Sequence, residues 1–312
     1  MNKNILSICD LSSEQILSII DLAVYLKDPL NTINSKKQLE GKILGMLFQK
    51  PSTRTRISFE TAILQLGGNA INLSFNDLQL SRGESIEDTA RTFSLYLDCL
   101  VARVFSHSDI ELLSQYSNIP VINGLSDLFH PCQVLADLLT IMEYKKRLEG
   151  ITLAFVGDGN NVCNDLLLGC SKLGINIKIS TPSGFEPLKR VVDVAKKDSA
   201  KNNSYVLVSN DPSEVVKDAD VVVTDTFISI GKESEKQHRD GIFLPKYQVN
   251  TSLVKNAKED YIFMHCLPAK RGMEVTGEII DGPHSVVWSE AKNRLYVQKA
   301  LLIKLLDKDF VD

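Results

Sequence analysis

The greatest density of reactive side chains lies in Pro51–Arg56 (PSTRTR), between an apolar run and an amphipathic segment. Hydroxyl groups, two guanidinium groups and the free N–H groups of a helix start all favour a bound anion. An arginine can also bind two oxygens of one phosphate group. A simple helix cap needs one hydroxyl and no arginine, and the glycine spacing of a Walker P-loop is absent. We therefore predict an anion site of another kind.

Further donors for an anion or a carbonyl oxygen follow two other apolar runs of the first half. Arg103 lies within residues 100–105, where its charge must meet either an internal carboxylate or a bound anion. His130 and Gln133 flank the start of a predicted helix, and each side chain can donate a hydrogen bond. A lone histidine in such a position is more often structural. Here, however, donor side chains follow three of the predicted strands, and this recurrence favours a binding site.

The second half carries polar groups of a different kind. Residues 157–161 (GDGNN) lack the third glycine of a dinucleotide fingerprint, and Asp158 would repel a pyrophosphate. The side-chain amides there, together with Asp225 after another apolar run, suit a zwitterion such as an amino acid. The Cys266 thiol, which follows residues 261–265, could be a nucleophile, a proton relay or a small core residue.

Apolar runs and amphipathic segments alternate along the whole chain, which predicts parallel sheets covered by helices. We expect strands at residues 42–49, 71–75, 100–105, 120–123, 152–156, 175–180, 205–209, 219–224 and 261–265. We expect helices at residues 57–66, 109–116, 131–148, 164–172, 187–197, 213–217 and 289–306, and another that begins at a capping box at residue 85. Ligands of such folds bind beyond the carboxyl ends of the strands, where the polar groups described above lie.

Two sheets of four or five strands fit this pattern better than one very wide sheet. We predict an α/β fold with two doubly wound parallel-sheet domains joined by long helices, residues 1–140 forming the first and residues 141–288 the second. The C-terminal helix, residues 289–312, is expected to pack back on the first domain. The polar segment 229–250 breaks the alternation, so we expect a loop there that is either a lid or a solvated insertion.

Composition excludes several classes of protein. The 312 residues are 44% hydrophobic and 24% charged with a net charge of −4, which argues against a nucleic-acid or membrane-surface protein. No apolar run is long enough for a transmembrane helix, and the N-terminus lacks the apolar run of a signal peptide. The six cysteines form no Cys-x-x-Cys pair and no zinc-finger pattern, so we expect no disulfides, no metal site and a cytoplasmic location.

Taken together, the motifs resemble those of the ornithine carbamoyltransferases over nearly the whole chain. The strings that carry the resemblance are residues 52–56 (STRTR), 88–91 (DTAR), 130–133 (HPCQ), 135–137 (LAD), 157–161 (GDGNN), 229–231 (SIG) after Asp225, and 265–268 (HCLP). Aspartate carbamoyltransferase shares the first-half motifs but is not expected to have the last string. The resemblance therefore implies transfer of a carbamoyl group from carbamoyl phosphate to the δ-amine of L-ornithine, giving L-citrulline and phosphate, in arginine metabolism.

The resemblance also implies roles for individual residues. Carbamoyl phosphate would be bound in the first domain with help from the second by Ser52, Thr53, Arg54, Thr55, Gln79, Arg103, His130, Gln133, Cys266, Leu267 and Arg294. Ornithine would be bound in the second domain by Asn161, Asp225, Ser229 and Ile230, the last replacing the family's usual methionine. Catalytic roles would belong to Arg103, His130, Asp225 and Cys266.

The resemblance further implies a homotrimer without metal or organic cofactor, in which Gln79 reaches a neighbouring subunit's site. For the proton of the attacking amine, we expect the Cys266 thiolate, helped by Asp225, to be the acceptor or orienting group. Three alternatives stay open: a carbamoyltransferase for another amine, a binding or regulatory paralogue without activity, and a nicotinamide dehydrogenase, which rests only on Gly157-x-Gly159.

Overall fold

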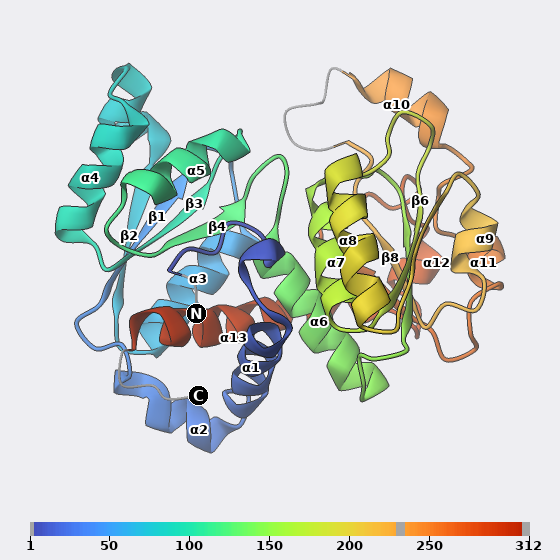
Figure 1. The fold of residues 1–312 in the computed structure, drawn as a ribbon, viewed down its shortest axis with the longest axis horizontal. Helices are drawn as coiled ribbons and strands as arrows, with labels where there is room; N and C mark the ends of the chain where they lie inside the picture. Colours follow the sequence, from blue (N-terminus) through green and yellow to red (C-terminus); the bar gives the residue numbers. More distant parts are fainter. Residues whose placement is uncertain (1–2, 229–234, 308–312) are drawn as a thin grey trace. The chain divides into compact units, whose positions relative to one another are not determined.

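The computed structural model describes residues 3–228 and 235–307, apart from the side chains of residues 32–34 and 236. The chain divides into two compact units (Figure 1). The first unit comprises Met1–Leu139 and Lys292–Asp312, and the second comprises Thr140–Ala291. Each unit is built on one sheet whose strands all run parallel, so the predicted fold class is confirmed.

The sheet of the first unit has four strands in the order β2-β1-β3-β4. They are β1 (Ile43–Phe48), β2 (Asn69–Ser74), β3 (Cys99–Arg103) and β4 (Val121–Leu125). The inner strands β1 and β3 are almost wholly apolar because helices cover both faces of a parallel sheet. The chain leaves β1 in one direction to β2 and returns to β3 on the other side. The carboxyl ends of β1 and β3 are therefore the point where a doubly wound sheet binds its ligand.

The helices of the first unit include two that we did not predict, α1 and α2. The α-helices are α1 (Ser13–Tyr25), α2 (Pro29–Asn34), α3 (Arg54–Gln65), α4 (Ile86–Tyr96) and α5 (His107–Tyr116). The 3-10 turns are η1 (Ile8–Asp10), η2 (Ser35–Lys37), η3 (Phe75–Asp77) and η4 (Gln79–Arg82). A capping box of Ser12 and Gln15 opens α1, and this was the available sequence signal. The predicted N-cap of α4 is confirmed, because the Ser85 hydroxyl accepts a hydrogen bond from the Asp88 N–H.

The sheet of the second unit has five strands in the order β7-β6-β5-β8-β9. They are β5 (Thr152–Val156), β6 (Asn176–Ser180), β7 (Val206–Ser209), β8 (Val221–Thr224) and β9 (Ile262–His265). Here the winding direction changes between β5 and β8, whose last residues Val156 and Thr224 are paired. Thr224 is also paired with His265 at the end of β9. The polar residues that follow these three strands are thereby brought to one edge of the sheet.

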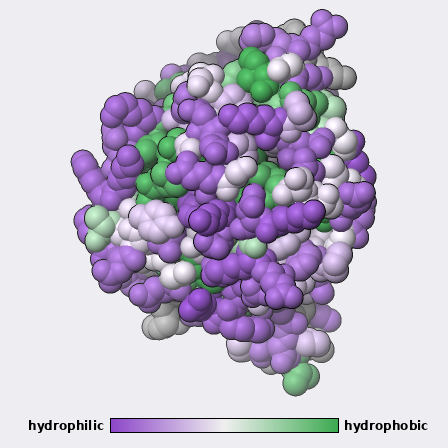
Figure 2. Space-filling view, turned by 90° about the vertical axis from the view of Figure 1, so that its right-hand side faces the viewer, coloured by the Kyte–Doolittle hydropathy of each residue, from purple (hydrophilic) through white to green (hydrophobic). Residues whose placement is uncertain are grey.

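Two long helices begin in one unit and end in the other: α6 (Pro131–Lys145) and α13 (Val287–Leu306). The other helices of the second unit are α7 (Asn161–Lys172), α8 (Lys189–Lys201), α9 (Pro212–Val216), α10 (Lys236–Phe243), α11 (Thr251–Val254) and α12 (Gly277–Ile280). Among the described residues, no helix is both long and apolar enough to cross a bilayer. Figure 2 shows a largely hydrophilic face, on which hydrophobic residues form small separate groups.

The expectation of a loop throughout residues 229–250 is wrong, because α10 lies within this segment. Its last residue, Phe243, is fully buried and stacks on Phe227, with ring centroids 4.6 Å apart. Phe185 meets the same ring edge-on at 5.0 Å. Burial of this aromatic cluster holds a polar helix on the unit, and the tertiary contact outweighs the weak apolar pattern of the segment. The part of the segment at 229–234 lies outside the described residues.

Candidate active site

The first polar cluster begins where β1 passes into α3. Thr53 is the N-cap residue of α3, but its side chain makes no capping hydrogen bond to the described first turn. The N–H groups of a first helical turn have no partners within the helix and carry the positive end of its dipole. Arg54 is half-buried at the first helical position, and Ser52, two residues before it, is also half-buried. This turn can bind a phosphate group with backbone, hydroxyl and guanidinium donors together.

Arg103 lies beside this turn. It ends β3, where it is paired with Phe48 of β1, and its carbonyl accepts a hydrogen bond from the Gln49 N–H at 2.9 Å. One of its guanidinium nitrogens lies 3.4 Å from the Ser52 hydroxyl. The Arg103 side chain therefore extends toward the predicted anion-binding turn.

A buried chain of hydrogen bonds fixes the remaining groups of this cluster. Arg294 of α13 donates from one nitrogen to Gln133 Oε1 at 2.7 Å and from another to the Thr55 hydroxyl at 2.9 Å. Gln133 Nε2 in turn donates to Asp137 Oδ1 at 2.9 Å. All four side chains are at most 2% exposed. Because a carboxylate only accepts, Asp137 sets the orientation of the Gln133 amide and so turns its oxygen toward Arg294.

Sequence reasoning missed Asp137 as a member of this chain of hydrogen bonds. The string Leu135-Ala136-Asp137 contributes to the resemblance, but no role was assigned to it. The available signal was spacing, since residues four apart on a helix face the same side. Gln133 and Asp137 have that spacing on α6.

His130 lies in the same cluster in its neutral form. Burial holds the pKa of the imidazole well below its usual value, and the charges of Arg294, Arg103 and Arg54 lower it further. A neutral imidazole can donate one hydrogen bond and accept another. The first unit thus gathers three guanidinium groups around one neutral donor, an arrangement that suits an anion with a carbonyl group attached.

The other residues predicted for carbamoyl phosphate lie elsewhere. Gln79 is exposed at the start of η4, which follows the edge strand β2. Cys266 and Leu267 belong to the second unit, where they follow β9. The structure therefore brings together, within the first unit, the remaining members of the predicted set: Ser52, Thr53, Arg54, Thr55, Arg103, His130, Gln133 and Arg294.

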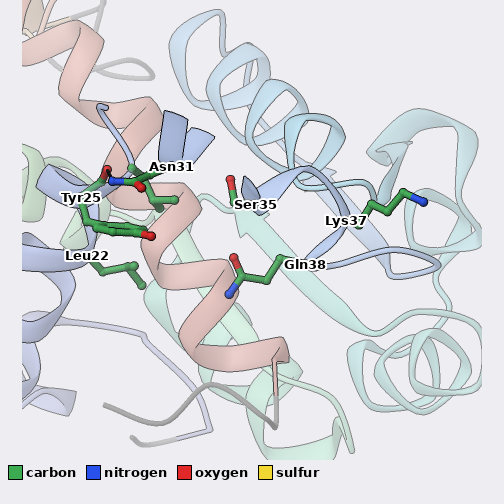
Figure 3. Close-up of a pocket in the computed structure, with 7 residues that line it drawn as sticks. Leu22, Tyr25, Asn31, Ser35, Lys37 and Gln38 are labelled. Carbon is green, nitrogen blue, oxygen red and sulfur yellow. Dashed lines mark hydrogen bonds between the residues drawn. The ribbon is translucent and has the colours of Figure 1, made fainter. Parts of the chain in front are cut away.

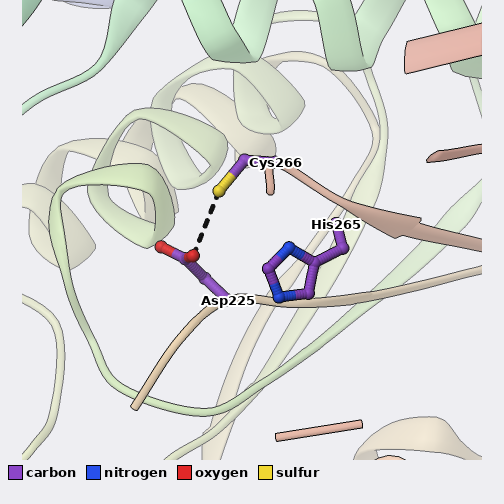
Figure 4. Close-up of side chains that lie close together, drawn as sticks. All are labelled: Asp225, His265 and Cys266. Atoms are coloured by element: carbon purple, nitrogen blue, oxygen red, sulfur yellow. Dashed lines mark hydrogen bonds between the residues drawn. The ribbon is translucent and has the colours of Figure 1, made fainter. Parts of the chain in front are cut away.

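The second cluster is centred on the Asp225 carboxylate, which follows β8 (Figure 4). Its Oδ1 accepts hydrogen bonds from Cys266 Sγ at 3.0 Å and from the Thr226 N–H at 2.7 Å. Its Oδ2 accepts from Asn160 Nδ2 at 2.7 Å. Asp225 is 7% exposed, whereas Cys266 is half-buried. The cluster thus holds a carboxylate in contact with an accessible thiol.

The amide that holds this carboxylate is that of Asn160, to which the sequence analysis assigned no separate role, whereas Asn161 is the residue predicted for ornithine. Asn160 also caps α7, since its Oδ1 accepts from the Val162 and Cys163 N–H groups at 3.0 and 3.1 Å. The Asn161 oxygen accepts from the Val162 N–H at 2.9 Å, and the residue is half-buried. The N-cap position in the sequence was a signal for Asn160. Ser229 and Ile230, the other residues predicted for ornithine, lie outside the described residues.

Arg239 of α10 was also missed. It donates to Asp158 Oδ2 at 2.6 Å and to the Phe227 carbonyl at 2.9 Å, and its side chain is 4% exposed. Its third partner, the Glu235 carboxylate, lies 2.7 Å from Nε. The negative charge of Asp158, which we expected to repel a pyrophosphate, is therefore balanced within the unit. No local sequence pattern indicates that Asp158 and Arg239, which are far apart in the sequence, form an ion pair.

Asp225, His265 and Cys266 offer oxygen, nitrogen and sulfur atoms within 4.8 Å of one another, a grouping that could hold a metal ion. The His265 ring is already engaged at both nitrogens, however. Nδ1 accepts from the Leu267 N–H at 2.8 Å, and Nε2 lies 3.3 Å from Glu274 Oε1. A metal would have to break a buried hydrogen bond to reach the ring, which is costly. The grouping suits proton transfer between a thiol and a carboxylate better than ligation.

A cavity of about 580 Å³ lies in the first unit among α1, α2 and η2 (Figure 3). Its amide side chains are engaged within the unit, because Asn31 donates to the Tyr25 carbonyl and Gln38 to Asp307. None of the residues predicted to bind either substrate lines it. It offers no group suited to carbamoyl transfer and is not a candidate active site.

Comparison with known proteins agrees with this geometry. The family profile described as "Aspartate/ornithine carbamoyltransferase, carbamoyl-P binding domain" matches residues 3–143, and "Aspartate/ornithine carbamoyltransferase, Asp/Orn binding domain" matches residues 149–305. The chain is 50% identical to the ornithine carbamoyltransferase of Pyrococcus horikoshii, covering 97% of this chain and 96% of that one. It is 51% identical to the Bacillus subtilis ornithine carbamoyltransferase, covering 98% and 94%.

A solved structure gives the same result. The ornithine carbamoyltransferase of Pyrococcus furiosus superposes with a TM-score of 0.94 at 48% identity, covering 99% of this chain and 98% of that one. The two family profiles extend over both units and span the positions of the motifs on which the resemblance was based. The chain therefore belongs to the aspartate/ornithine carbamoyltransferase family, and within it to the ornithine carbamoyltransferases.

Proposed function

We propose that this chain transfers the carbamoyl group of carbamoyl phosphate to the δ-amine of L-ornithine and releases L-citrulline and phosphate. The observation that carries the proposal is the cluster of the first unit, in which Arg54 opens α3, Arg103 lies 3.4 Å from the Ser52 hydroxyl, and Arg294 is hydrogen-bonded to Gln133 and Thr55. A concentration of positive charge of this kind favours an anionic ligand. A role in arginine biosynthesis is part of the proposal, and a Pyrococcus furiosus relative is named anabolic.

Carbamoyl phosphate binds to the first cluster in this proposal. Its phosphate lies at the start of α3, where Ser52, Thr53 and Thr55 supply hydroxyl donors and Arg54 a guanidinium. Arg103 spans the phosphate and the carbamoyl oxygen, and His130 and Gln133 donate to that oxygen. Arg294 contacts the carbamoyl group. The name of the matching family domain, which refers to carbamoyl phosphate, supports this assignment.

Ornithine binds to the second cluster. Asp225 carries the negative charge that an ammonium group needs, and Asn161, Ser229 and Ile230 bind the α-amino and α-carboxylate groups. Cys266 and Leu267 lie at the δ-nitrogen and also complete the carbamoyl-phosphate site. The Asp/Orn binding domain that matches this region supports the proposal.

The reaction requires a neutral δ-amine, whereas an alkyl ammonium has a pKa near 10.4 in water. Burial and the neighbouring α-ammonium both disfavour the second positive charge. The hydrogen-bonded pair of Cys266 and Asp225 holds one proton between its sulfur and its carboxylate, so the pair can accept the proton of the amine as its second. The neutral nitrogen then attacks the carbamoyl carbon, and Arg103, Thr55 and His130 stabilise the oxyanion that forms. The C–O bond to phosphate then breaks, and phosphate leaves with both bonding electrons as an anion held by Arg54. The departing phosphate takes up the proton that the attacking nitrogen must lose to become the N–H of citrulline.

We further propose that residues 1–140 with the C-terminal helix bind carbamoyl phosphate and that residues 141–288 bind ornithine. The active form is a homotrimer in the cytoplasm, in which Gln79 completes the site of a neighbouring subunit. Exposed apolar side chains on the first unit, at Ile57, Leu64 and Ile71, support burial by another subunit. Mass measurement in solution, with and without charge substitutions at Leu64 and Ile71, tests the assembly. A monomer with full activity would contradict it.

The substrate assignment is tested by measuring carbamoylated product from carbamoyl phosphate with a panel of amines. The account predicts citrulline from ornithine and at least about 100-fold lower kcat/KM for the other two amines, since putrescine lacks the α-carboxylate and N-acetylornithine lacks the charge of the α-ammonium. Preference for putrescine would move the assignment to another amine. Absence of product with every amine would favour a binding or regulatory paralogue, and binding of a nicotinamide dinucleotide would favour the dehydrogenase alternative.

A further inference from the structure

A turn at residues 126–129 connects β4 to His130, the residue that directly precedes α6. The His130 carbonyl accepts hydrogen bonds from the Gln133 and Val134 N–H groups at 3.0 and 3.3 Å, which fixes the backbone on the helix side. His130 is only 4% exposed, so its ring has little room to move once its backbone is placed. The direction in which the imidazole points therefore depends on how the turn before it is held.

Ser126 closes this turn. Its N–H donates to the Phe129 carbonyl at 3.0 Å, and its hydroxyl accepts from the Phe129 N–H at 3.3 Å. The hydroxyl also accepts from Asn123 Nδ2 at 3.2 Å, and both Ser126 and Asn123 are fully buried. Because these two donors occupy both lone pairs of the hydroxyl oxygen, the hydroxyl hydrogen needs an acceptor of its own.

His107, the first residue of α5, supplies this acceptor. Its Nδ1 lies 2.8 Å from the Ser126 hydroxyl oxygen, which is closer than the Phe129 carbonyl at 3.4 Å. The hydroxyl therefore donates to Nδ1, and the neutral ring carries its hydrogen on Nε2. Nε2 lies 3.8 Å from Oε1 of the exposed Glu111. The ring of His107 is 7% exposed, so water does not readily replace the Ser126 contact.

Two further contacts join His107 to the same turn. Its N–H belongs to the first turn of α5, where it has no partner within the helix, and donates to Asp127 Oδ1 at 2.7 Å. The dipole of α5 favours a carboxylate at this end. The imidazole also meets the Phe129 ring edge-on, with ring centroids 5.0 Å apart. His107 thus contacts three of the four residues that precede His130.

We propose that His107 is a positioning residue for His130: through its N–H, its Nδ1 and its ring it fixes the turn at residues 126–129 and thereby directs the His130 imidazole at the carbamoyl oxygen. His107 itself need not touch a substrate. The inference rests on the proposed function, which assigns His130 to that oxygen. Sequence analysis gave His107 no role, because its partners lie in another turn of the chain.

Two isosteric substitutions test the contact with Ser126. Asparagine and leucine have nearly the same size, and both remove the ring that packs on Phe129. In His107→Asn the amide oxygen can still accept from the Ser126 hydroxyl. In His107→Leu that hydroxyl must turn to the Phe129 carbonyl, 3.4 Å away, and the turn moves with it. A displacement of about 1 Å at reacting groups can lower kcat roughly 100-fold, so we expect a smaller shift to place kcat of His107→Leu about 10-fold below that of His107→Asn.

Other properties should not separate the two variants. Inorganic phosphate binds at the start of α3 without His130 in the proposed function, so titration calorimetry should give the same phosphate affinity for both. Their thermal unfolding midpoints should agree within a few degrees. Equal kcat values in the two variants would overturn the proposal. A weaker affinity for phosphate in His107→Leu would also overturn it, because the substitution would then disturb the whole cluster.

A second pair of variants serves if His107→Leu does not fold. Asp127 is exposed, so its replacement is tolerated more readily. In Asp127→Asn the amide oxygen can still accept from the His107 N–H, whereas in Asp127→Leu no acceptor remains. We again expect the leucine variant to have the lower kcat, and equal kcat values would overturn the proposal.

A readout that does not depend on turnover is the NMR spectrum of the imidazole groups. The chain has five histidines, so labelling histidine with ¹⁵N gives signals from five rings, and His130→Gln identifies those of His130 by their loss. We expect the His130 signals to differ between His107→Asn and His107→Leu, with those of His107→Asn closer to wild type. Identical His130 signals in the two variants would overturn the positioning role. A wild-type enzyme that forms no citrulline would instead overturn the proposed function, and the NMR comparison would still decide the role of His107.

Discussion

The two polar clusters differ in how their groups are held and in what they can do. In the first unit, Arg294, Gln133 and Asp137 form a fully buried chain, and His130 is kept neutral. In the second unit, a carboxylate meets a half-buried thiol next to a segment that includes α10. Fixed positive charge suits binding of an anion and stabilisation of an oxyanion, whereas a thiol–carboxylate pair suits movement of a proton. The comparison predicts that substitutions in the two clusters have different kinetic signatures.

The largest effect is expected for Arg54→Ala, which removes a guanidinium from the phosphate position at the start of α3. We expect kcat/KM for carbamoyl phosphate to fall about 1,000-fold or more, because a preorganised charged donor is lost. Arg56 lies two residues further on the same helix, is exposed, and faces Glu60 at 3.9 Å. Arg56→Ala is therefore the matched control, with near wild-type kinetics. Similar losses in the two variants would show a structural effect and contradict the phosphate assignment.

A smaller effect is expected for Cys266→Ala. Loss of a group that accepts or orients a proton lowers kcat roughly 100-fold, while affinity for the donor substrate changes less. The dependence of kcat on pH should change as well, because another group or water must take the proton. Kinetics across a pH series check this, with Cys9→Ala as the control at an exposed thiol. An unchanged profile would place proton transfer elsewhere.

An effect of roughly 10-fold is expected for Asp137→Asn on KM for carbamoyl phosphate. The asparagine amide can donate, so the Gln133 amide can turn over and present its NH₂ group to Arg294. A hydrogen bond to a charged group contributes about 1.5–3 kcal/mol, which sets the scale of the loss. Steady-state kinetics with Asp137→Glu as the acceptor-only control test the orienting role. If Asp137→Asn behaves as the wild type, the buried chain of hydrogen bonds does not position Arg294.

The smallest effect concerns stability. The pKa of His130 is lowered by burial and by the three arginines, so the unfolded chain binds a proton at a higher pH than the folded one. Stability is therefore present above the unfolded value near 6.5 and falls as pH decreases below it, by at most about 1.4 kcal/mol per pH unit. Denaturant unfolding at several pH values, with His130→Gln for comparison, measures this slope. The same slope in the variant would exclude His130 as its source.

The strands, and the turn between β1 and α3, could be predicted because their signals are local. Apolar runs in β1, β3 and β5 require no knowledge of distant residues, and the PSTRTR string lies directly after the first of them. The motifs in their order were sufficient for the family, as the comparisons confirm. The missing elements had weaker patterns: α10 is a polar helix held by a buried aromatic residue, and no expectation was made for α1 and α2.

Contacts between residues distant in sequence could not be predicted. Asn160 meets Asp225 and Arg239 meets Asp158 only because the sheet places the ends of β5 and β8 side by side. Glu274 reaches His265 because the loop after β9 folds back on itself. The residue types of a single sequence do not show which distant residues form such pairs. The resemblance supplied the residues expected at the substrates but not the side chains that orient them.

The most direct test of the account is calorimetric titration of carbamoyl phosphate into two variants, combined with citrulline measurement. Arg54→Ala should show no measurable binding of carbamoyl phosphate. Asp225→Asn should bind it as tightly as the wild type yet form citrulline at least about 100-fold more slowly, because the carboxylate acts on the amine. Equal weakening of carbamoyl-phosphate binding in both variants, or full citrulline formation by Asp225→Asn, would contradict the assignment of anion binding and proton movement to separate clusters.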